Sequence, residues 1–343
     1  MFNLSATMKK KILISIAAFL LLIIAFFGWN LFGPTVHAPE QKFLYIRTGA
    51  TYKDVTDSLT TNNILGGTAW FSMAAKIAGY TNIKPGRYEI KKGISVLSLV
   101  RMLKNGTQSP INFVITKIRT REVLAGRIGR AFECDSTAML AFFNNADSLQ
   151  QFGLDTNTVM VAAMPLTYTL KWNTTPSRIF REFHTAWSTF WNAGRKQRAD
   201  SLGLTPAQVS ILASIIDEET NADKDRPNIA SVYLNRLKQG MPLQADPTVK
   251  FALRNFGLRR IYEKQLLTES PYNTYVNKGL PPGPICTPAE HTIDAVLTAP
   301  KTDYIYFVAS SAFDGTHVFT SNYKDHMTYA RLYQKELNNR NVK

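Results

Sequence analysis

Residues 211–220 read ILASIIDEET and place three acids directly after a run of apolar residues. On a helix that turns about 100° per residue, four apolar side chains share one face: Val209, Leu212, Ile215 and Ile216. Glu219 falls near the centre of this face, because residues three and four positions apart lie above one another. The pattern predicts that Glu219 points toward the apolar interior, while Asp217 and Glu218 face water.

A carboxylate directed into an apolar interior is costly to ionise unless it is paired. Its pKa rises, which suits a general acid working near neutral pH. Two structural interpretations compete with this one. The helix end could fray and leave Glu219 in water, or a structural arginine such as Arg236 could hold the carboxylate.

Composition bounds the class of protein. The chain has 343 residues, enough for two or three domains, and 45% of them are hydrophobic, enough for a sizeable core. Its net charge is +15. A charge of this size favours an anionic partner, either nucleic acid, a membrane surface or an acidic polymer.

The N-terminus narrows this choice. Residues 12–29 are uncharged and mostly apolar, and lysines occupy positions 9–11. A helix of this length nearly crosses a hydrocarbon core of roughly 30 Å, and the lysines favour a cytoplasmic N-terminus. We expect a single-pass anchor in the cytoplasmic (inner) membrane with the rest of the chain on the extracytoplasmic side, which argues against nucleic acid. A signal peptide cleaved near Ala38 is the alternative, but its apolar run usually has only about 7–15 residues.

Turn signals and composition divide the chain into four segments. We expect a cytoplasmic tip and transmembrane anchor, a small α+β module, a mostly helical bridging region and an α+β domain, at residues 1–34, 42–110, 111–198 and 199–343. Residues 33–41 read as a linker between the first two. The predicted fold class is α+β.

The last segment carries clear start signals for helices. Thr205 and Gln208 form a capping box around Pro206, and TPAE at 287–290 repeats this pattern. Asp246 is a candidate N-cap. Residues 228–239 read as a helix, and residues 303–309 and 317–320 as strands.

Amides and aromatic residues gather in the Pro/Gly-rich loops of this segment: Gln244, Tyr272, Asn273, Tyr275 and Asn322. Such loops suit a carbohydrate, because amides bond hydroxyl and acetamido groups and aromatic rings cover sugar faces. Each residue also has a structural alternative as a turn former, cap or core side chain. Cys134 and Cys286 could form a disulfide or remain free thiols. No cluster has zinc spacing, so neither a metal nor another cofactor is expected.

Four stretches together resemble one family: ILASIIDEET, IASVYLNRLKQGMPLQADPTV, SPYNTYVNKGLPPGPICTP, and KTDYIYFVAS followed by HVFTSN. They are similar to the YceG-like (MltG) endolytic murein transglycosylases of bacterial inner membranes. The stretch from KPGRYEI to LVRMLKNG resembles the LysM-like module of this family. The N-terminal half is a looser match than the C-terminal motifs.

The resemblance implies lytic cleavage of peptidoglycan within a glycan strand. The β-1,4 bond between N-acetylmuramic acid and N-acetylglucosamine breaks, and the muramic acid's own 6-hydroxyl attacks the anomeric carbon to leave a 1,6-anhydro end. One carboxyl group suffices, whereas most glycosidases use two. The family's catalytic glutamate corresponds to Glu219, the residue that the helical face also selects.

The resemblance also implies the surroundings of the acid and its partners. Five residues are expected to line the cleft, Gln244, Tyr272, Asn273, Tyr275 and Asn322, with Ser214 one helical turn below the acid. Cutting of nascent strands near the membrane and association with peptidoglycan synthases are expectations from the family.

This chain departs from the family pattern at two places. Asp217 stands where the family has glutamate, and residues 162–168 read AAMPLTY where the family usually has Glu-Gly followed by Phe-Pro-Asp-Thr-Tyr. Two acids are therefore missing from the second stretch. If these acids shape a substrate groove, we expect their loss to change the affinity for glycan and to leave the catalytic assignment unaffected.

Two other functions compete with this one. Residues 321–324 have the S-x-x-K spacing of penicillin-binding proteins, but no Lys-Thr-Gly follows. A membrane-anchored protein that binds peptidoglycan without cutting it would also suit the basic charge, the LysM-like module and the missing acids. Glu219 on the apolar face argues against that second alternative.

Overall fold

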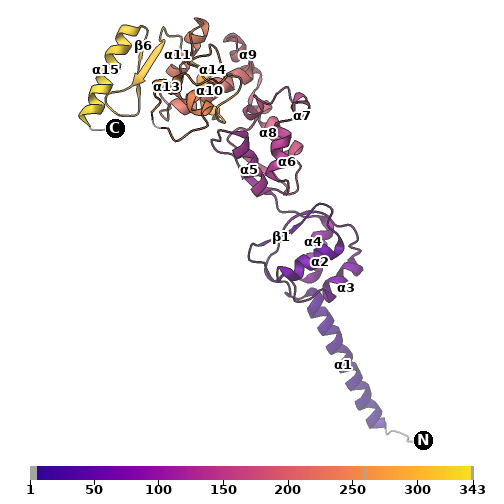
Figure 1. Cartoon of the computed structure of the whole chain (residues 1–343). Helices are drawn as coiled ribbons and strands as arrows, with labels where there is room; N and C mark the ends of the chain where they lie inside the picture. The colour runs from indigo at the N-terminus through magenta and orange to yellow at the C-terminus, as the bar shows by residue number, and fades with distance from the viewer. Residues whose placement is uncertain (1–5, 259, 341–343) are drawn as a thin grey trace. The chain divides into compact units, whose positions relative to one another are not determined.

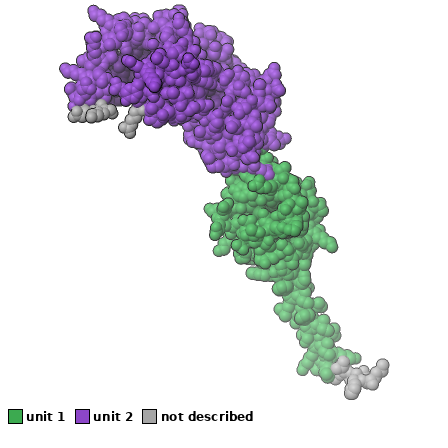
Figure 2. All heavy atoms as spheres, in the orientation of Figure 1, with its two compact units in different colours: residues 1–111, 169–174 green, residues 112–168, 175–343 purple. Residues whose placement is uncertain are grey.

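The computed structural model describes residues 6–258 and 260–340. They fall into two compact units, which Figure 2 shows in different colours. The first unit comprises residues 1–111 and 169–174, and the second comprises residues 112–168 and 175–343. Both contain helices and short strands, so the chain is a mixed α+β protein as predicted (Figure 1).

Helix α1 (Ala6–Phe32) begins the described chain. Among the described residues, it is the one unbroken helix long and apolar enough to cross a membrane, over Thr7–Phe32. Protein atoms bury none of its most apolar stretch. A helix of this length and composition can span a bilayer.

The rest of the first unit surrounds its own core. Its elements are β1 (Phe43–Ile46), α2 (Tyr52–Thr61), α3 (Ala69–Ala78), β2 (Gly86–Glu89) and α4 (Val96–Asn105). Strands β1 and β2 pair antiparallel, with Leu44 opposite Tyr88. Leu44 and Ile46 are buried while Tyr45 between them is exposed, which is the alternation expected of a strand with one buried face.

The stretch predicted as a linker, residues 33–41, is instead packed into the first unit. Val36 is only 1% exposed, and its amide donates to the Ile94 carbonyl at 3.2 Å. The next amide, of His37, donates to the Ile64 carbonyl at 2.9 Å. The stretch connects α1 to β1 without a helix or strand, and these contacts fix its path on the first unit.

The end of α1 is also attached to this unit. The Phe27 and Trp70 rings meet edge to face with centroids 5.1 Å apart. At Gly33 the chain turns so tightly that a Cβ atom would lie 2.3 Å from the Trp29 carbonyl oxygen. Only glycine fits this approach, so the chain leaves the helix and enters the unit within one turn.

The next part of the chain consists mostly of short helices. The elements are β3 (Ile111–Val114), α5 (Arg121–Ala131), α6 (Ser136–Phe143), α7 (Ala146–Gln150), the 3₁₀ helix η1 (Val159–Ala162), β4 (Thr167–Leu170), α8 (Pro176–Phe190) and α9 (Ala193–Ser201). Strands β3 and β4 fall at the sequence boundaries between the two units. The later part of the second unit contains α10 (Pro206–Glu219), α11 (Arg226–Lys238), α12 (Asp246–Ala252), α13 (Glu263–Leu266), α14 (Glu290–Leu297), β5 (Tyr306–Ala309), β6 (His317–Thr320) and α15 (Tyr323–Asn339).

Helix α10 is the central helix of this unit. The predicted capping box is confirmed: the Thr205 hydroxyl accepts from the Gln208 amide, and the Gln208 side chain accepts from the Thr205 amide. Every residue from Val209 to Asp217 is buried. The helix packs against α11, α12 and α14, and this enclosure fixes the position of its C-terminal acids.

Two predicted caps are wrong. The Thr287 hydroxyl does not cap α14 but donates to the Thr116 carbonyl and accepts from the Ile118 amide. Ala245, not Asp246, is the N-cap of α12. In both cases a tertiary hydrogen-bond partner competes with the local capping pattern and wins.

The C-terminal strands are confirmed, with β5 starting later than predicted. Strands β5 and β6 pair antiparallel, with Phe307 opposite Phe319. Helix α15, which follows them, was not predicted. Asn322 forms its N-cap by accepting from the Asp325 amide at 2.9 Å.

Candidate active site

A cavity of about 360 Å³ opens at the end of α10. It collects residues from α11, α12, β5, β6, α15 and two loops: Glu219, Arg236, Leu243, Gln244, Asp246, Tyr275, Tyr306, Phe307, Val308, Ala309, His317, Tyr323 and His326. Segments that are about 100 residues apart in the sequence thus meet around the one acid selected by the helical pattern.

The Glu219 carboxyl group is held at the floor of this cavity. The Tyr233 hydroxyl, on α11, donates to Glu219 Oε1 at 2.6 Å. Burial raises the pKa of Glu219 to about 7, against an ordinary value of 4.5. The Tyr233 hydrogen bond lowers the pKa in opposition, and the Asp246 charge raises it. At neutral pH such a group is present in both protonation states, so it can give a proton and take one back.

Tyr233 is well suited to hold this carboxyl group. Its side chain is 1% exposed and its ring meets Phe307 edge to face at 5.8 Å. Burial and the neighbouring Glu219 raise the pKa of Tyr233 well above its ordinary value. The phenol therefore stays protonated and remains a donor, which leaves Glu219 Oε2 to carry the acid proton.

Asp246 also lines the cavity. It accepts a hydrogen bond from the Tyr275 hydroxyl at 2.6 Å. Burial and this bond raise the pKa of Tyr275, so Tyr275 is also a fixed donor. Gln244, two residues before Asp246, has a φ of +53° and its amide donates to the Thr274 carbonyl. The left-handed backbone directs the chain so that the exposed Gln244 side chain borders the cavity.

Arg236 supports the wall of the cavity and does not hold the acid. Its guanidinium donates to the carbonyls of Ile305 and Leu243, at 2.7 Å each. It also lies over the Tyr306 ring, 5.3 Å from its centroid. The alternative in which a structural arginine neutralises Glu219 is thus replaced by the hydrogen bond from Tyr233.

Two histidines complete the cavity wall. His317 Nδ1 lies 2.9 Å from Asp225 Oδ2, and the His317 backbone amide donates to the same oxygen. His326 stacks on Tyr306 with centroids 5.1 Å apart. Burial lowers the pKa of His326, so this ring is neutral at pH 7.

The other two acids of the stretch do not face water as predicted. Asp217 is 3% exposed and accepts from the Ala289 amide and the Thr292 hydroxyl, at 2.7 Å each. Glu218 is 14% exposed at its side chain and pairs with Arg119. The prediction treated the helix as having one buried face, whereas the unit surrounds its last turn on several sides. Each acid has a different partner, and Glu219 alone lines the cavity.

The structure separates the six residues predicted around the acid. Gln244 and Tyr275 line the cavity with Glu219. Ser214 is buried and accepts from the Ile285 amide at 3.0 Å. Asn273 is fully buried and its amide group donates to the carbonyls of Leu266 and Thr268.

The remaining two predicted residues lie at other places in the second unit. Tyr272 packs on Phe251, with ring centroids 4.6 Å apart, and borders a separate pocket. Asn322 is exposed and caps α15. The residues that the sequence reasoning missed are Tyr233, Tyr306, His317, Tyr323 and His326. For Tyr233, a helical-face count on residues 226–238 was the available signal.

The stretch that lacks two family acids is part of the core. Ala162, Ala163 and Met164 are at most 1% exposed, and Met164 packs in the same cluster as Leu212 and Ile216. None of residues 162–168 lines the cavity at Glu219. The loss of these acids therefore leaves the wall of the cavity intact.

The structure also places the two cysteines and the S-x-x-K stretch. Cys134 and Cys286 are free thiols, so the open question of a disulfide is answered. Within residues 6–258 and 260–340, no group of three or more His, Cys, Asp or Glu side chains could hold a metal ion. In the S-x-x-K stretch, Lys324 is exposed on the first turn of α15.

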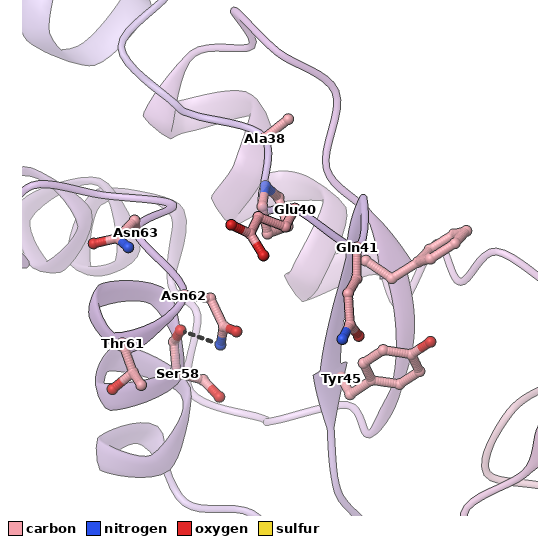
Figure 3. A pocket seen from close by; sticks show the side chains of 10 residues that line it. Ala38, Glu40, Gln41, Tyr45, Ser58, Thr61, Asn62 and Asn63 are labelled. Atoms are coloured by element: carbon pink, nitrogen blue, oxygen red, sulfur yellow. Dashed lines mark hydrogen bonds between the residues drawn. The ribbon is translucent and has the colours of Figure 1, made fainter. Parts of the chain in front are cut away.

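A larger cavity, of about 570 Å³, lies in the first unit (Figure 3). The Glu40 carboxylate projects into the space between the end of α2, with Asn62, and the β1 side, with Tyr45. Its lining is rich in amides and hydroxyls, from Gln41, Ser58, Thr61, Asn62 and Asn63, beside the Glu40 carboxylate. Phe43 and Tyr45 supply aromatic surface. Such a lining suits a polar ligand with flat faces, such as a sugar.

A model of the YceG-like family matches residues 44–331. The chain belongs to the YceG-like family. The resemblance seen in the four sequence stretches is thereby confirmed. Family membership covers both units, because the matched residues run from β1 to the middle of α15.

YceG-like relatives are similar over most of the chain. A Bacillus subtilis (strain 168) protein named endolytic murein transglycosylase is 30% identical over 320 residues, covering 87% of this chain and 88% of the relative. A Streptococcus pneumoniae (strain D39) protein of the same name is 26% identical and covers 92% of this chain, which spans 64% of that relative. A crystal structure of a YceG-like protein from Listeria monocytogenes has a TM-score of 0.56 and 27% identity, covering 84% of this chain and 99% of that one.

Proposed function

We propose that this chain is an endolytic murein transglycosylase that cuts the β-1,4 bond between N-acetylmuramic acid and N-acetylglucosamine. The observation that carries this proposal is the Glu219 carboxyl group, with a pKa raised to about 7, in an open cavity bordered by the Gln244 amide and aromatic rings. The names of the relatives from Bacillus subtilis and Streptococcus pneumoniae support the same activity.

The reaction follows from the properties of this single carboxyl group. Protonated Glu219 gives its proton from Oε2 to the oxygen that leaves with N-acetylglucosamine, and the bond from this oxygen to the anomeric carbon breaks. The 6-hydroxyl of the muramic acid then attacks the anomeric carbon and loses its proton to the Glu219 carboxylate. The acid is regenerated, no water is consumed, and a 1,6-anhydro end remains.

The rest of the cavity eases the charge that develops on the sugar. The anomeric carbon becomes positively charged as its bond breaks. The carboxylate left on Glu219 and the negative charge of Asp246 stabilise this positive charge. Tyr233 keeps the carboxyl group oriented throughout. Gln244 and Tyr275 are proposed to contact the sugars, and their place in the lining of the cavity supports this.

The other site residues are proposed for indirect or distant roles. Ser214 and Asn273 are positioning residues, because they fix the loops at Ile285 and Leu266. Tyr272 and Asn322 are proposed to contact sugars farther along the strand. An endolytic enzyme needs such distant contacts, because the glycan extends beyond the cut on both sides.

Helix α1 supports a proposal for the location of the enzyme. We propose that α1 is a single-pass anchor in the cytoplasmic membrane, with the catalytic domain on the extracytoplasmic side. The four segments proposed are the anchor, the LysM-like module, the bridging region and the YceG-like catalytic domain, at 1–34, 42–110, 111–198 and 199–343. An anchored enzyme would cut nascent strands near the membrane, where peptidoglycan synthases are its proposed partners.

The LysM-like module is proposed to hold the glycan. The cavity beside Glu40 supports this, because its amides and aromatic rings have the composition of a sugar site (Figure 3). In that role, the module would keep the strand bound while the catalytic domain cuts it.

Digestion in water enriched in oxygen-18 tests the proposed reaction. The full chain, in detergent micelles, is incubated with uncrosslinked strands, and the products are analysed by mass spectrometry. We expect internal fragments with 1,6-anhydro ends and no incorporated label. Labelled reducing ends would mean that the enzyme is a hydrolase, and intact strands would favour a wall-binding protein.

A further inference from the structure

Two smaller pockets lie side by side in the second unit, outside the cavity at Glu219. One of about 80 Å³ is bordered by Arg119, Lys250 and Phe256, and one of about 110 Å³ by Arg121 and Arg254. Both pockets have Arg119 and Phe251 in their lining, so they are neighbours. We call the surface formed by Arg119, Arg121, Lys250, Phe251, Arg254 and Phe256 the basic furrow.

Positive charge exceeds negative charge along the basic furrow. Four cationic side chains line it, against two carboxylates, Glu218 and Glu122. Arg119 binds Glu218 through both Nε and Nη2, at 3.1 and 2.8 Å from Oε2. Arg254 Nη1 lies 3.2 Å from Glu122 Oε2. A surface of this kind attracts a ligand with more than one negative group.

The furrow has the apolar surface and the free cation that a bound carboxylate needs. Arg119 and Arg254 lie over the Phe256 and Phe251 rings, at 5.1 and 5.3 Å from the centroids. The stacked rings keep the planar guanidinium groups in place, and such groups bind carboxylates with two parallel bonds. Within the part of the chain that the structure describes, the Lys250 ammonium has no hydrogen bond or ion pair.

Helix α12 connects the furrow to the catalytic cavity. Asp246 borders the cavity, and Lys250, one turn later, borders the furrow. The two side chains start about 6 Å apart along the helix axis. Both also act on the pKa of Glu219, which places the furrow within electrostatic reach of the catalytic carboxyl group.

We propose that the basic furrow binds the carboxylates of the peptide stem carried by the muramic acid beside the cut. This inference rests on the proposed function and names the part of the substrate that gives selectivity. The stem starts at the lactyl group of the muramic acid that reacts at Glu219. An extended peptide advances about 3.4 Å per residue, so about two residues cover the roughly 6 Å along α12 from Asp246 to Lys250.

The shape of the furrow favours a peptide over a lipid surface. Each pocket has the volume of a side chain or a carboxylate, about 80 and 110 Å³, and is bordered by Phe251. A bilayer surface is broad and flat and would meet exposed lysines instead. The arrangement therefore fits single carboxylates on a narrow chain.

The test compares strands with and without stems. Uncrosslinked strands are used intact, or after an amidase has removed the peptides from the lactyl groups. The full chain in detergent micelles is compared with the Lys250→Gln/Arg254→Gln double variant. The matched control, Lys301→Gln/Arg331→Gln, removes the same charge from exposed positions outside the furrow.

We expect the furrow variant to have a KM about ten-fold higher for intact strands, from a few-fold loss at each exposed contact. Its KM for stripped strands stays within about two-fold, and the control variant is unchanged on both. Because Lys250 also acts on the pKa of Glu219, the KM ratio between the two substrates is the deciding quantity. An equal change on both substrates, or none on either, would overturn the proposal.

A binding measurement separates failure of this proposal from failure of the proposed function. Muramyl tetrapeptide, and the same compound with its carboxylates converted to amides, are titrated into the full-length Glu219→Gln protein by calorimetry. We expect the carboxylate form to bind more tightly and the furrow substitutions to remove the difference. Equal binding of the carboxylate and amide forms would overturn the proposal even if no strand is cut. Furrow substitutions that remove binding to anionic vesicles, and leave the difference between the two muramyl compounds unchanged, would also overturn it.

Discussion

Tyr233 Oη lies 2.6 Å from Glu219 Oε1, and this contact joins the last turn of α10 to the middle of α11. Two opposing influences on the pKa of Glu219 act at this contact. Burial raises the pKa of Glu219 to about 7, which favours the protonated form, while the hydrogen bond from the phenol favours the carboxylate. The balance allows one group to act first as an acid and then as a base.

Tyr233→Phe removes the donor and should raise the pKa of Glu219 above about 7. The group then remains protonated at higher pH, so the alkaline limb of the pH–rate profile moves upward, by about one pH unit. The rate at pH 7 should fall about ten-fold, because the carboxyl group also loses its orientation. Release of anhydro ends between pH 5 and 9 measures both, with Tyr304→Phe as the control. An unchanged alkaline limb would show that the phenol does not act on Glu219.

Asp246→Asn should shift the same limb in the opposite direction. The Asp246 carboxylate raises the pKa of Glu219, so removal of its charge lowers that pKa. The enzyme would lose its acid form at a lower pH than the wild type does. Asparagine still accepts from the Tyr275 hydroxyl, so the cavity keeps its shape. A shift to higher pH would contradict the electrostatic role of Asp246.

Glu219→Gln should stabilise the fold at alkaline pH. The raised pKa contributes stability that is fully present below about 4.5 and is lost as the pH rises through about 7. Glutamine carries no charge and avoids this loss, so the variant gains relative to wild type between these pH values, up to about 3 kcal/mol above pH 8. Thermal unfolding of the full chain at pH 5 and pH 8 measures the difference. A gain of equal size at both pH values would mean that folding does not raise the pKa of Glu219.

Asp217→Asn should destabilise the fold by about 3 kcal/mol. The role of Asp217 is structural and not catalytic. Asp217 accepts from the Ala289 amide and the Thr292 hydroxyl, and Arg226 Nη2 lies 3.5 Å from its Oδ1. Asparagine removes the buried one of the two carboxylates that pair with Arg226, which then keeps only the exposed Asp223. Thermal unfolding measures the loss, with Asp200→Asn on an exposed surface as the control. Equal stabilities of the two variants would refute the structural role of Asp217.

Residues 33–41 should resist proteolysis in the wild-type chain, because Val36 is buried and the chain is held by the Ile94 and Ile64 carbonyls. Four Gly/Ser residues inserted after Val36 should make the stretch sensitive, since they break the register of these two hydrogen bonds, each worth about 1 kcal/mol. Limited proteolysis followed by N-terminal sequencing locates the cuts. Rapid cleavage of the wild type between residues 33 and 41 would show that the stretch is a free linker.

The sequence predicted the features that depend on local patterns. The helical face of residues 209–219 identified Glu219, because three- and four-residue spacing needs no tertiary information. The capping box at Thr205 is confirmed for the same reason, because capping depends only on side chains and backbone groups three residues apart.

Features that depend on distant partners could not be predicted in this way. Asp217 was assigned to solvent, because its partners Ala289 and Thr292 come from α14, more than 70 residues later. Residues 33–41 have the composition of a linker, and only the pairing with Ile64 and Ile94 reveals that they are packed. Most of the cavity wall comes from β5, β6 and α15, whose approach to α10 is a tertiary fact.

The most direct test of the account counts anhydro ends formed by three proteins: the wild type, Glu219→Gln and Glu218→Gln. Strands are digested at pH 7 by the full chain in detergent micelles, and the ends are identified by mass spectrometry. We predict abundant anhydro ends from the wild type and from Glu218→Gln, and none from Glu219→Gln at equal folded concentration. Anhydro ends from Glu219→Gln, or their loss only in Glu218→Gln, would contradict the assignment of Glu219 as the catalytic acid.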